Sequence, residues 1–423
     1  MRAPVGFEML RQTLTLKPYR LFTFGNITSN LGMWMQRVAI GWLTWELTQS
    51  TAWLGIIAIC EAGPTIILGL VAGTVIDRVD QLKLLRLTQL FSLLYAAALG
   101  FFTLTDLMNI WLLVTLVLLR GVVISFSRPT RMTVIYGLVG RELLPSALAL
   151  NSMIFNASRF LGPAMGGAII AWAGTGWTFV AAFLMFWVMT FALRAIDEAR
   201  IEIPAPHIST RSVWTETLEG LRYILYHEGI RTQLALLIVV SIFAKPVTDL
   251  LPGFAADVFD RGSTGLAWLL TFHGAGAMLG AFWMTMRGSI VGLTRITLIN
   301  ILLMAVALGL FVATPSFWIS APLIALVGFA FIVQSVSNQT LIQSAIDSSL
   351  RGRVLSVYGM INQAVPSLGT LAIGLAAERF GLRLPVAVGA AVCILLFAWT
   401  WRFRTRMAKM LENEAVAAPS EAL

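Results

Sequence analysis

The sequence predicts an all-α membrane protein with twelve transmembrane helices in two pseudo-symmetric six-helix halves. An apolar composition, an internal repeat and a series of long apolar runs lead to this prediction. Hydrophobic residues make up 58% of the 423 residues and charged residues only 12%, whereas a soluble domain carries about 25% charge. A soluble chain of this size would need more polar side chains to cover its surface, so the apolar excess must face a lipid bilayer.

The internal repeat appears when the second half is laid over the first with an offset of 207 residues. Seven of the 17 glycines in residues 1–216 then fall on another glycine, where chance predicts roughly one or two matches. A duplicated membrane protein is typical of secondary transporters, whose site lies between the halves near the bilayer midplane. The matched pairs are Gly55–Gly262, Gly69–Gly276, Gly73–Gly280, Gly121–Gly328, Gly162–Gly369, Gly167–Gly374 and Gly174–Gly381.

Twelve apolar runs are long enough to cross a bilayer, which takes about 20 residues. We expect a first half over 1–196, a cytoplasmic linker over 197–230, a second half over 231–405 and a cytoplasmic tail over 406–423. Two prolines interrupt the linker, and an amphipathic helix is possible from about Ser212. The expected spans are 19–46, 52–76, 82–104, 109–128, 146–171, 177–196, 231–256, 264–286, 292–313, 317–343, 354–379 and 383–403.

The cations decide the orientation. Of the 30 Lys and Arg residues, 23 lie in the termini, the linker and the loops on one side, and only Arg261, Arg379 and Arg383 lie in loops on the other. Short cytoplasmic loops are enriched in Lys and Arg. We therefore expect a multi-pass protein of the cell inner membrane with both termini in the cytoplasm.

Several functional classes receive no support from the sequence. The net charge of +9 is spread over short loops without a basic stripe, which argues against nucleic-acid binding. Cys60 and Cys393 lie inside apolar runs, and no His/Cys spacing predicts a metal site. No phosphate-binding loop and no nucleophile–base arrangement occurs. We therefore expect a protein that is not an enzyme, has no cofactor and is a monomer.

The segment "GTVIDRVDQLK" places Gly73, Asp77 and Arg78 at the spacing of a G-x-x-x-D-R loop. A glycine lets helices approach closely, and a carboxylate at a helix end can accept backbone N–H bonds or pair with a cation, which would latch one conformation. Lys83 and Arg86 are the nearby cations that could supply the positive charge. The alternative is an ordinary charged cytoplasmic loop.

A second motif, Gly162, Pro163, Gly166 and Gly167, matches a G-P-x-x-G-G pattern. Proline bends the helix and glycines permit close packing. This pattern resembles the element of drug:proton antiporters, in which it is associated with export. The alternative is helix packing alone.

Over nearly its whole length the chain resembles the major facilitator superfamily, and the segments "SNLGMWMQRVAIGWLTWELTQS" and "SRPTRMTVIYGLVGRELLPSALALNSM" resemble its enterobactin-exporter-like branch. The resemblance implies a transport role, export, and a siderophore- or drug-like cargo. Related antiporters often carry an arginine where this chain has Val117. Arg120 lies three residues later, and whether it takes over a proton-relay role stays open.

Ionisable side chains inside the spans are costly and are therefore functional candidates. Arg37 and Lys245 occupy nearly repeat-related positions, and in the resembled fold both helices line the central cavity, which suits an anionic or polyhydroxylated cargo. Asp249, four residues after Lys245, would neutralise it on one helix face, or the two would form a structural ion pair. Arg159 is a further cavity candidate. Arg128 and Arg131 are expected to be interfacial anchors or latch partners.

Glu61 is the best candidate for a proton carrier, because desolvation favours the protonated carboxyl group. Asp249 and Arg120 are further candidates for proton coupling. The alternatives for Glu61 are a hydrogen-bonded neutral acid or a permanent pair with Arg37 or Arg120. His273 could line the cavity and titrate, or serve in packing.

The predicted function is proton-driven export of a small amphiphilic or anionic molecule by alternating access. The alternatives are an importer or facilitator of the same fold, and a membrane module that does not transport.

Overall fold

The computed structural model describes residues 5–76, 78–197, 213–346 and 350–417. These residues form helices joined by short connections, and no strand occurs among them. Within the described ranges, ten helical stretches are long and apolar enough to cross a membrane. The 32-residue helix α2 (Lys17–Thr48) is not among the ten, because polar residues such as Asn26, Asn30 and Gln36 interrupt its apolar character.

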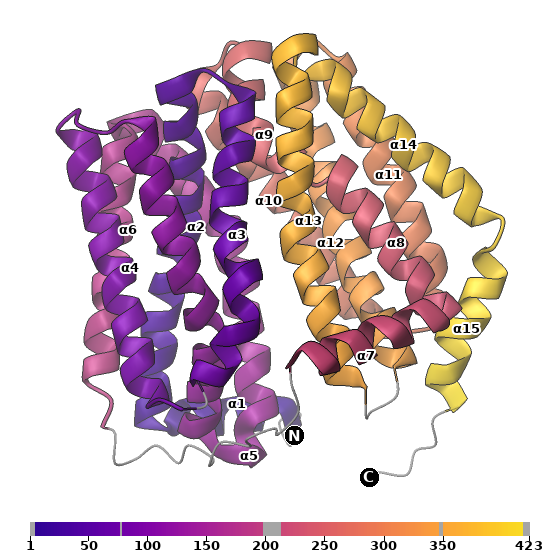
Figure 1. The fold of residues 1–423 in the computed structure, drawn as a ribbon, viewed down its shortest axis with the longest axis horizontal. Coiled ribbons are helices and arrows are strands. Elements are labelled where there is room, and N and C mark those ends of the chain that lie inside the picture. The colour runs from indigo at the N-terminus through magenta and orange to yellow at the C-terminus, as the bar shows by residue number, and fades with distance from the viewer. Residues whose placement is uncertain (1–4, 77, 198–212, 347–349, 418–423) are drawn as a thin grey trace. The chain divides into compact units, whose positions relative to one another are not determined.

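The chain divides into two compact units, and the first comprises Met1–Thr48 and Cys60–Ser209. Within this unit, α2 packs against α5 and α6, and α4 packs against the same two helices, as Figure 1 shows. The expected range 82–104 agrees closely with α4. The unit contains α1 (Val5–Thr15), α2, most of α3 (Thr51–Ile76), α4 (Gln81–Leu104), α5 (Ile110–Ala173) and α6 (Thr175–Arg194).

The expected turn between spans 109–128 and 146–171 is present at Gly140, although helix continues through most of residues 129–145. Helix α5 runs for 64 residues and is broken only at Gly140, whose φ of 71° and ψ of −179° are not helical. Residues 129–139 stay helical because their apolar side chains are buried: Val134 and Ile135 join a core with Leu82 and Leu85 of α4. Burial against α4 thus extends the helix beyond the apolar run.

The connection after α3 bears on the proposed latch. Gly73 lies in α3 and Arg78 in an exposed turn, whereas Asp77 lies outside the described residues. Asp80 caps α4: its Oδ1 accepts a hydrogen bond from the backbone N–H of Lys83 at 3.0 Å, and this bond holds the pKa of the Asp80 carboxyl below its usual value. The latch itself stays a prediction.

Arg86, which the sequence offered as a latch cation, has a different role in the structure. Its Nε donates to the carbonyl oxygen of Leu193 at 3.1 Å and its Nη2 to that of Ile196 at 2.7 Å. It therefore satisfies unpaired carbonyl groups at the C-terminal end of α6.

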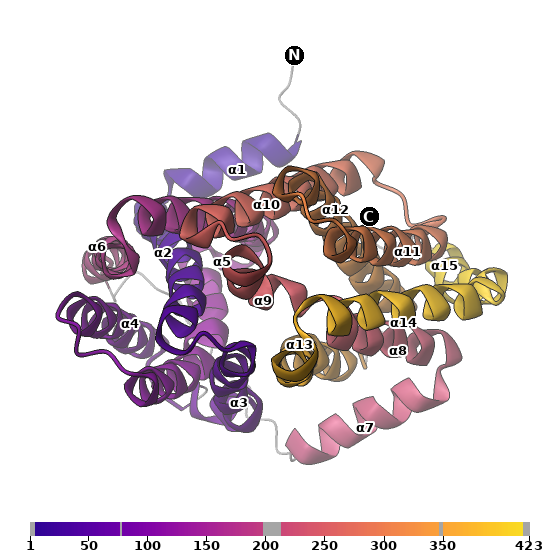
Figure 2. The ribbon, with the colours of Figure 1, turned by 90° about the horizontal axis from the view of Figure 1, so that it is seen from above.

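The second unit comprises Gln49–Ile59 and Thr210–Leu423. Helix α7 occupies the segment where an amphipathic helix was possible, and it packs against α13 and α8. Figure 2 shows α10 beside α12, and α14 beside α8. The unit contains α7 (Val213–Tyr226), α8 (Glu228–Phe243), α9 (Val247–Gly253), the π-helix η2 (Phe254–Val258), α10 (Gly262–Arg287), α11 (Leu293–Ala313), α12 (Phe317–Ala345), α13 (Arg351–Phe380), α14 (Arg383–Trp401) and α15 (Arg404–Ala417).

The first residues of α3 belong to the second unit because side chains of α13 hold them. The carboxylate of Glu378 accepts hydrogen bonds from the Ser50 hydroxyl at 2.6 Å and from the backbone N–H of Ala52 at 3.0 Å. The Thr51 hydroxyl donates to the carbonyl oxygen of Gly374 at 2.8 Å. The carboxylate therefore sits at the N-terminus of α3, where the helix dipole favours negative charge.

Two of the glycine pairs that match in the repeat have matching roles in the two units. Gly174 and Gly381 end α5 and α13 with φ values of 93° and 72°, a backbone conformation that glycine adopts without strain. A Cβ at Gly162 would lie 2.5 Å from the Trp34 Cβ, and one at Gly369 would lie 2.5 Å from the carbonyl oxygen of Ile242. The repeated glycines thus permit close contact between helices within each unit.

Candidate functional site

Glu61 of α3 and Arg120 of α5 form an ion pair in the first unit. The Arg120 Nη1 lies 2.7 Å from the Glu61 Oε1, and the two side chains are 8% and 26% exposed. The helices can approach because position 121 is glycine: a Cβ there would lie 2.8 Å from the carbonyl oxygen of Glu61. Of the alternatives for Glu61, the structure therefore shows the pair with Arg120. The guanidinium also lies 5.9 Å from the centroid of the Tyr95 ring.

Three further arginines lie in the same unit. Arg37 of α2 and Arg159 of α5 both lie over the ring of Trp34, and Arg128 of α5 lines the same cavity as Arg120. We call Arg37, Arg120, Arg128 and Arg159 the arginine cluster. Charges of one sign are costly together inside a membrane, so this group of arginines is a candidate binding site for an anion.

The Trp34 ring lies against two members of the arginine cluster, Arg37 and Arg159. The guanidinium carbons of Arg37 and Arg159 lie 5.6 Å and 5.7 Å from the centroid of the Trp34 ring, within the range of cation–π attraction. Phe155 contacts the same ring edge-on with centroids 5.8 Å apart. This arrangement orients both cations.

The glycine–proline motif of α5 places Trp34. In addition to the contact of Gly162 with Trp34, a Cβ at Gly166 would lie 3.1 Å from the Met35 Cα. Pro163 and Gly167 are buried in the same stretch. The motif therefore packs α5 tightly onto α2, as the packing alternative predicted. Its association with export is not tested by this geometry.

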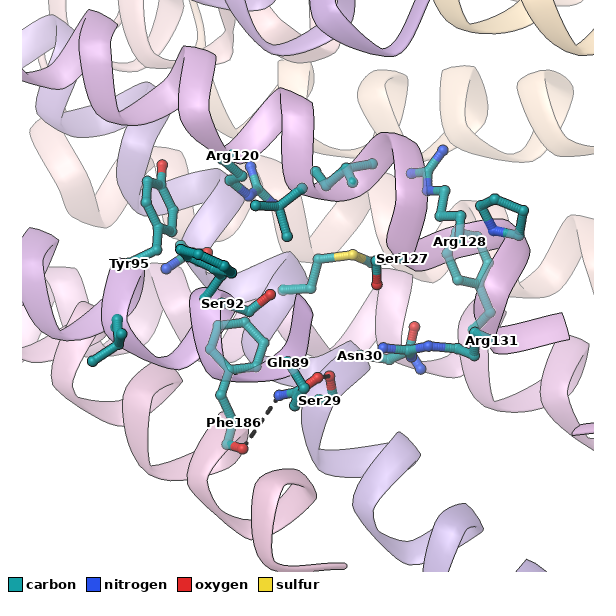
Figure 3. A pocket seen from close by; sticks show the side chains of 18 of the residues that line it. Ser29, Asn30, Gln89, Ser92, Tyr95, Arg120, Ser127, Arg128, Arg131 and Phe186 are labelled. Carbon is teal, nitrogen blue, oxygen red and sulfur yellow. Dashed lines mark hydrogen bonds between the residues drawn. The ribbon is translucent and has the colours of Figure 1, made fainter. Parts of the chain in front are cut away.

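A cavity of about 760 Å³ lies among α2, α4, α5 and α6 in the first unit. This volume falls in the range of small-molecule sites, about 300–1,000 Å³. Apolar side chains such as Met33, Leu116 and Val123 form much of its wall. Figure 3 shows Arg120, Ser127, Arg128 and Arg131 along α5, Gln89, Ser92 and Tyr95 on α4, Ser29 and Asn30 on α2, and the hydrogen bond from the Gln89 amide to the carbonyl oxygen of Phe186.

One end of the cavity is a polar network around Asn26. Its Oδ1 accepts hydrogen bonds from Arg131 Nη1 at 2.6 Å and from Asn30 Nδ2 at 2.9 Å, and its Nδ2 donates to Asn151 Oδ1 at 2.9 Å. The sequence assigned Arg131 to the interface or the latch, whereas the structure places it in the cavity wall. Asn26 and Asn30, spaced one helical turn apart inside an apolar span, were the overlooked signal.

Lys245 and Asp249 of the second unit each contact a side chain of α13. Lys245 Nζ donates to Asn362 Oδ1 at 2.7 Å and lies 5.3 Å from the centroid of the Phe331 ring. Asp249 Oδ2 accepts a hydrogen bond from the Thr370 hydroxyl at 3.2 Å. The expected spacing of Lys245 and Asp249 on one helix face is wrong, because α8 ends at Phe243 and α9 begins at Val247.

His273 of α10 is a buried residue at a tight helix crossing. It is 9% exposed, and its carbonyl oxygen would lie 2.0 Å from a Cβ at Gly328 of α12. This contact favours the packing alternative for this residue. Among the described residues, no group of three or more His, Cys, Asp or Glu side chains is arranged to hold a metal ion.

The apolar helices together with a cation-lined cavity inside a helix bundle define a membrane transporter for small molecules. Family comparison agrees with this class. The chain belongs to the family described as "Transmembrane secretion effector", whose profile matches residues 12–422, and it is a member of the major facilitator superfamily.

Two curated relatives illustrate the range of the family. The chain is 26% identical over 398 residues to the multidrug efflux pump Tap of Mycolicibacterium fortuitum, covering 90% of this chain and 95% of that protein. It is 25% identical over 354 residues to the staphyloferrin A transporter of Staphylococcus aureus, covering 83% and 87%.

Solved structures support the fold. A peptide transporter POT in complex with sulfate superposes with a TM-score of 0.72 at 11% identity, covering 97% of this chain and all (100%) of that chain. The nucleoside transporter NupG superposes with a TM-score of 0.70 at 11% identity, covering 93% and 99%. At these identities the likeness concerns the fold alone.

Proposed function

We propose that this protein exports small amphiphilic or anionic molecules in exchange for protons, by alternating access of two six-helix halves around a site near the midplane. The observation that carries the proposal is the ion pair of Glu61 with Arg120, in the unit that also holds the other cations of the arginine cluster. The efflux pump and the siderophore transporter among the relatives support a cargo of this kind.

We infer twelve spans from the helices. The ten apolar stretches count α5 once, but its length on both sides of Gly140 suffices for two crossings at about 1.5 Å per residue. Helix α2 supplies one more, because its polar residues face the cavity or the arginine cluster rather than lipid. An even number of spans brings both termini to one side, and the distribution of cations indicates the cytoplasm.

Cysteine labelling tests this topology. In a protein without Cys60 and Cys393, cysteines introduced at the exposed positions Thr105 and Lys409 are expected to differ in reactivity. An impermeant thiol reagent applied to intact cells should label Thr105→Cys and spare Lys409→Cys, because the first lies on the extracytoplasmic side. Lysed cells provide the control, in which both variants should react. Labelling of Lys409→Cys in intact cells contradicts the topology.

The ion pair offers a physical route for proton coupling. Ionised Glu61 holds Arg120, and a proton on Glu61 removes the counter-charge and releases the guanidinium. In the proposed cycle, cargo occupies the arginine cluster while the site faces the cytoplasm and Glu61 is ionised. After cargo release to the outside, Glu61 takes up a proton and the empty carrier returns.

Neutralising Arg37 or Arg159 of the arginine cluster should weaken anion binding. For Arg37→Gln and Arg159→Gln we expect a loss of about 1.5–3 kcal/mol per charge-assisted hydrogen bond, which corresponds to a roughly 10- to 150-fold higher Kd. Calorimetry with acidic and neutral amphiphiles measures this loss. Lys409→Gln is the matched control, because it removes one exposed cation far from the cluster in sequence. Equal losses for acidic and neutral compounds would make the arginines structural.

A second candidate function is proton-coupled uptake of the same anions. One observation favours it: an anion and ionised Glu61 compete for the same arginines, so a proton on Glu61 strengthens anion binding, and joint binding of proton and cargo is the condition for symport. The direction of proton movement separates the two functions. In proteoliposomes with an internal pH indicator, anion entry should make the lumen alkaline by exchange and acidic by symport.

A further inference from the structure

The two ends of the cavity of the first unit differ in charge. We call the end at Leu116 and Leu119, where Arg120 is paired with Glu61, the apolar end, and the end at Arg131 the cationic end. Along α5, Leu116 and Leu119 precede Ser127 and Arg131 in its wall, and Leu119 and Arg131 lie about 18 Å apart at 1.5 Å per residue. Around Arg131, the polar groups are the amides of Asn26, Asn30 and Asn151. A ligand that fills this cavity therefore needs an apolar part and a polar part in a defined order.

The cavity opens between α4 and α5. Four large apolar side chains both line the cavity and are exposed, and all of them come from these two helices. Exposed apolar side chains on membrane-spanning helices face the hydrocarbon of the bilayer. The cavity is therefore open toward lipid at this edge. The four residues are Phe91, Leu94, Leu119 and Met132.

The cationic end lacks a matching acid. In the described part of the chain, no carboxylate lies within 4 Å of the Arg131 guanidinium, whose hydrogen-bond partner is an amide oxygen. A cation in the cavity wall without a matching acid favours an acidic ligand head.

We propose that this cavity binds a single-chain anionic amphiphile, such as a fatty acid, that enters from the bilayer between α4 and α5. Its acidic head lies at Arg131 and its chain along Leu119 and Leu94. In the proposed topology the end of α5 with Arg131 faces the cytoplasm. The direction from acidic head to apolar chain therefore matches that of a lipid in the cytoplasmic leaflet. The inference rests on the proposed function and specifies its cargo, since Arg120 and Arg128 belong to both the cavity and the arginine cluster.

Equilibrium binding of radiolabelled laurate to the protein in nanodiscs tests the proposal without any proton gradient, after subtraction of binding to protein-free nanodiscs. Leu119→Trp, which fills the opening, is expected to raise the laurate Kd about tenfold or more. Leu118→Trp is the matched control, because Leu118 is equally a leucine exposed on α5 but does not line the cavity. Equal laurate affinities of the two variants overturn the lateral opening.

Head-group charge is tested by competition and by substitution. Unlabelled laurate should displace the probe, whereas dodecyltrimethylammonium and butyrate should not, because one has the wrong charge and the other lacks the chain. Arg131→Gln should raise the Kd about tenfold, and Arg131→Lys should restore most of the affinity. Displacement by the cationic amphiphile as effective as by laurate overturns the proposal.

Failure of this inference and failure of the proposed function give different results. If gradient-driven transport of another anion persists while laurate does not bind, the function stands and the amphiphile site is wrong. If laurate binds as described but no proton-coupled flux of any cargo occurs, the site stands and the transport cycle is wrong.

Discussion

Glu61→Gln is expected to reduce proton-gradient-driven flux to the level of protein-free liposomes while leaving cargo binding intact. The amide cannot take up or release a proton, so the step that returns the empty carrier has no proton to couple. It also resembles the protonated acid, which frees Arg120 for an anion. Flux in proteoliposomes with an imposed pH gradient, together with calorimetric cargo binding, measures both effects.

Loss of folding must be separated from loss of coupling in this experiment. The Arg120 side chain is 8% exposed, and removing one partner of a buried ion pair can cost about 3–5 kcal/mol. The double variant Glu61→Gln/Arg120→Gln replaces both charges and should recover part of this stability without recovering flux. Glu61→Asp keeps a titratable carboxyl and should keep measurable flux. Full gradient-driven flux in Glu61→Gln removes this residue as the proton carrier.

Gly276→Ala is expected to be the most destabilising small substitution in the second unit. A Cβ at this position would lie 1.7 Å from the carbonyl oxygen of Ala325, and a backbone atom of α12 cannot turn aside as a side chain can. Helices α10 and α12 would have to separate along their contact, at a cost of about 3 kcal/mol or more. Thermal unfolding followed by size-exclusion chromatography should show a lower Tm or little folded protein.

Gly309→Ala supplies the matched control for this prediction. Gly309 lies in the neighbouring helix α11, and nothing lies within 4 Å of a Cβ built there. Because alanine has a higher helix propensity than glycine, this variant should be as stable as the parent or slightly more so. Equal stability of the two variants contradicts the close packing of α10 and α12.

Properties of the chain that depend on local composition could be read from the sequence. The apolar runs predicted a helical membrane protein, because lipid leaves backbone polar groups no partner outside a helix, and the range 82–104 agrees with α4. The matched glycines could be recognised for a related reason, since close helix contacts and positive φ angles exclude other residues. Glu61 and Arg120 stood out because charge inside an apolar run is costly.

Partners and helix ends depended on distant residues, and only the tertiary structure decided them. The close approach of Arg120 to Glu61 follows from the glycine contact between α5 and α3. Apolar contacts with α4 extend the helix as far as Gly140, into the stretch that was expected to be a turn. Arg131 enters the cavity because Asn26, 105 residues away, accepts its hydrogen bond. A local pattern sets the cost of burying a group, but only packing brings together the groups that offset this cost.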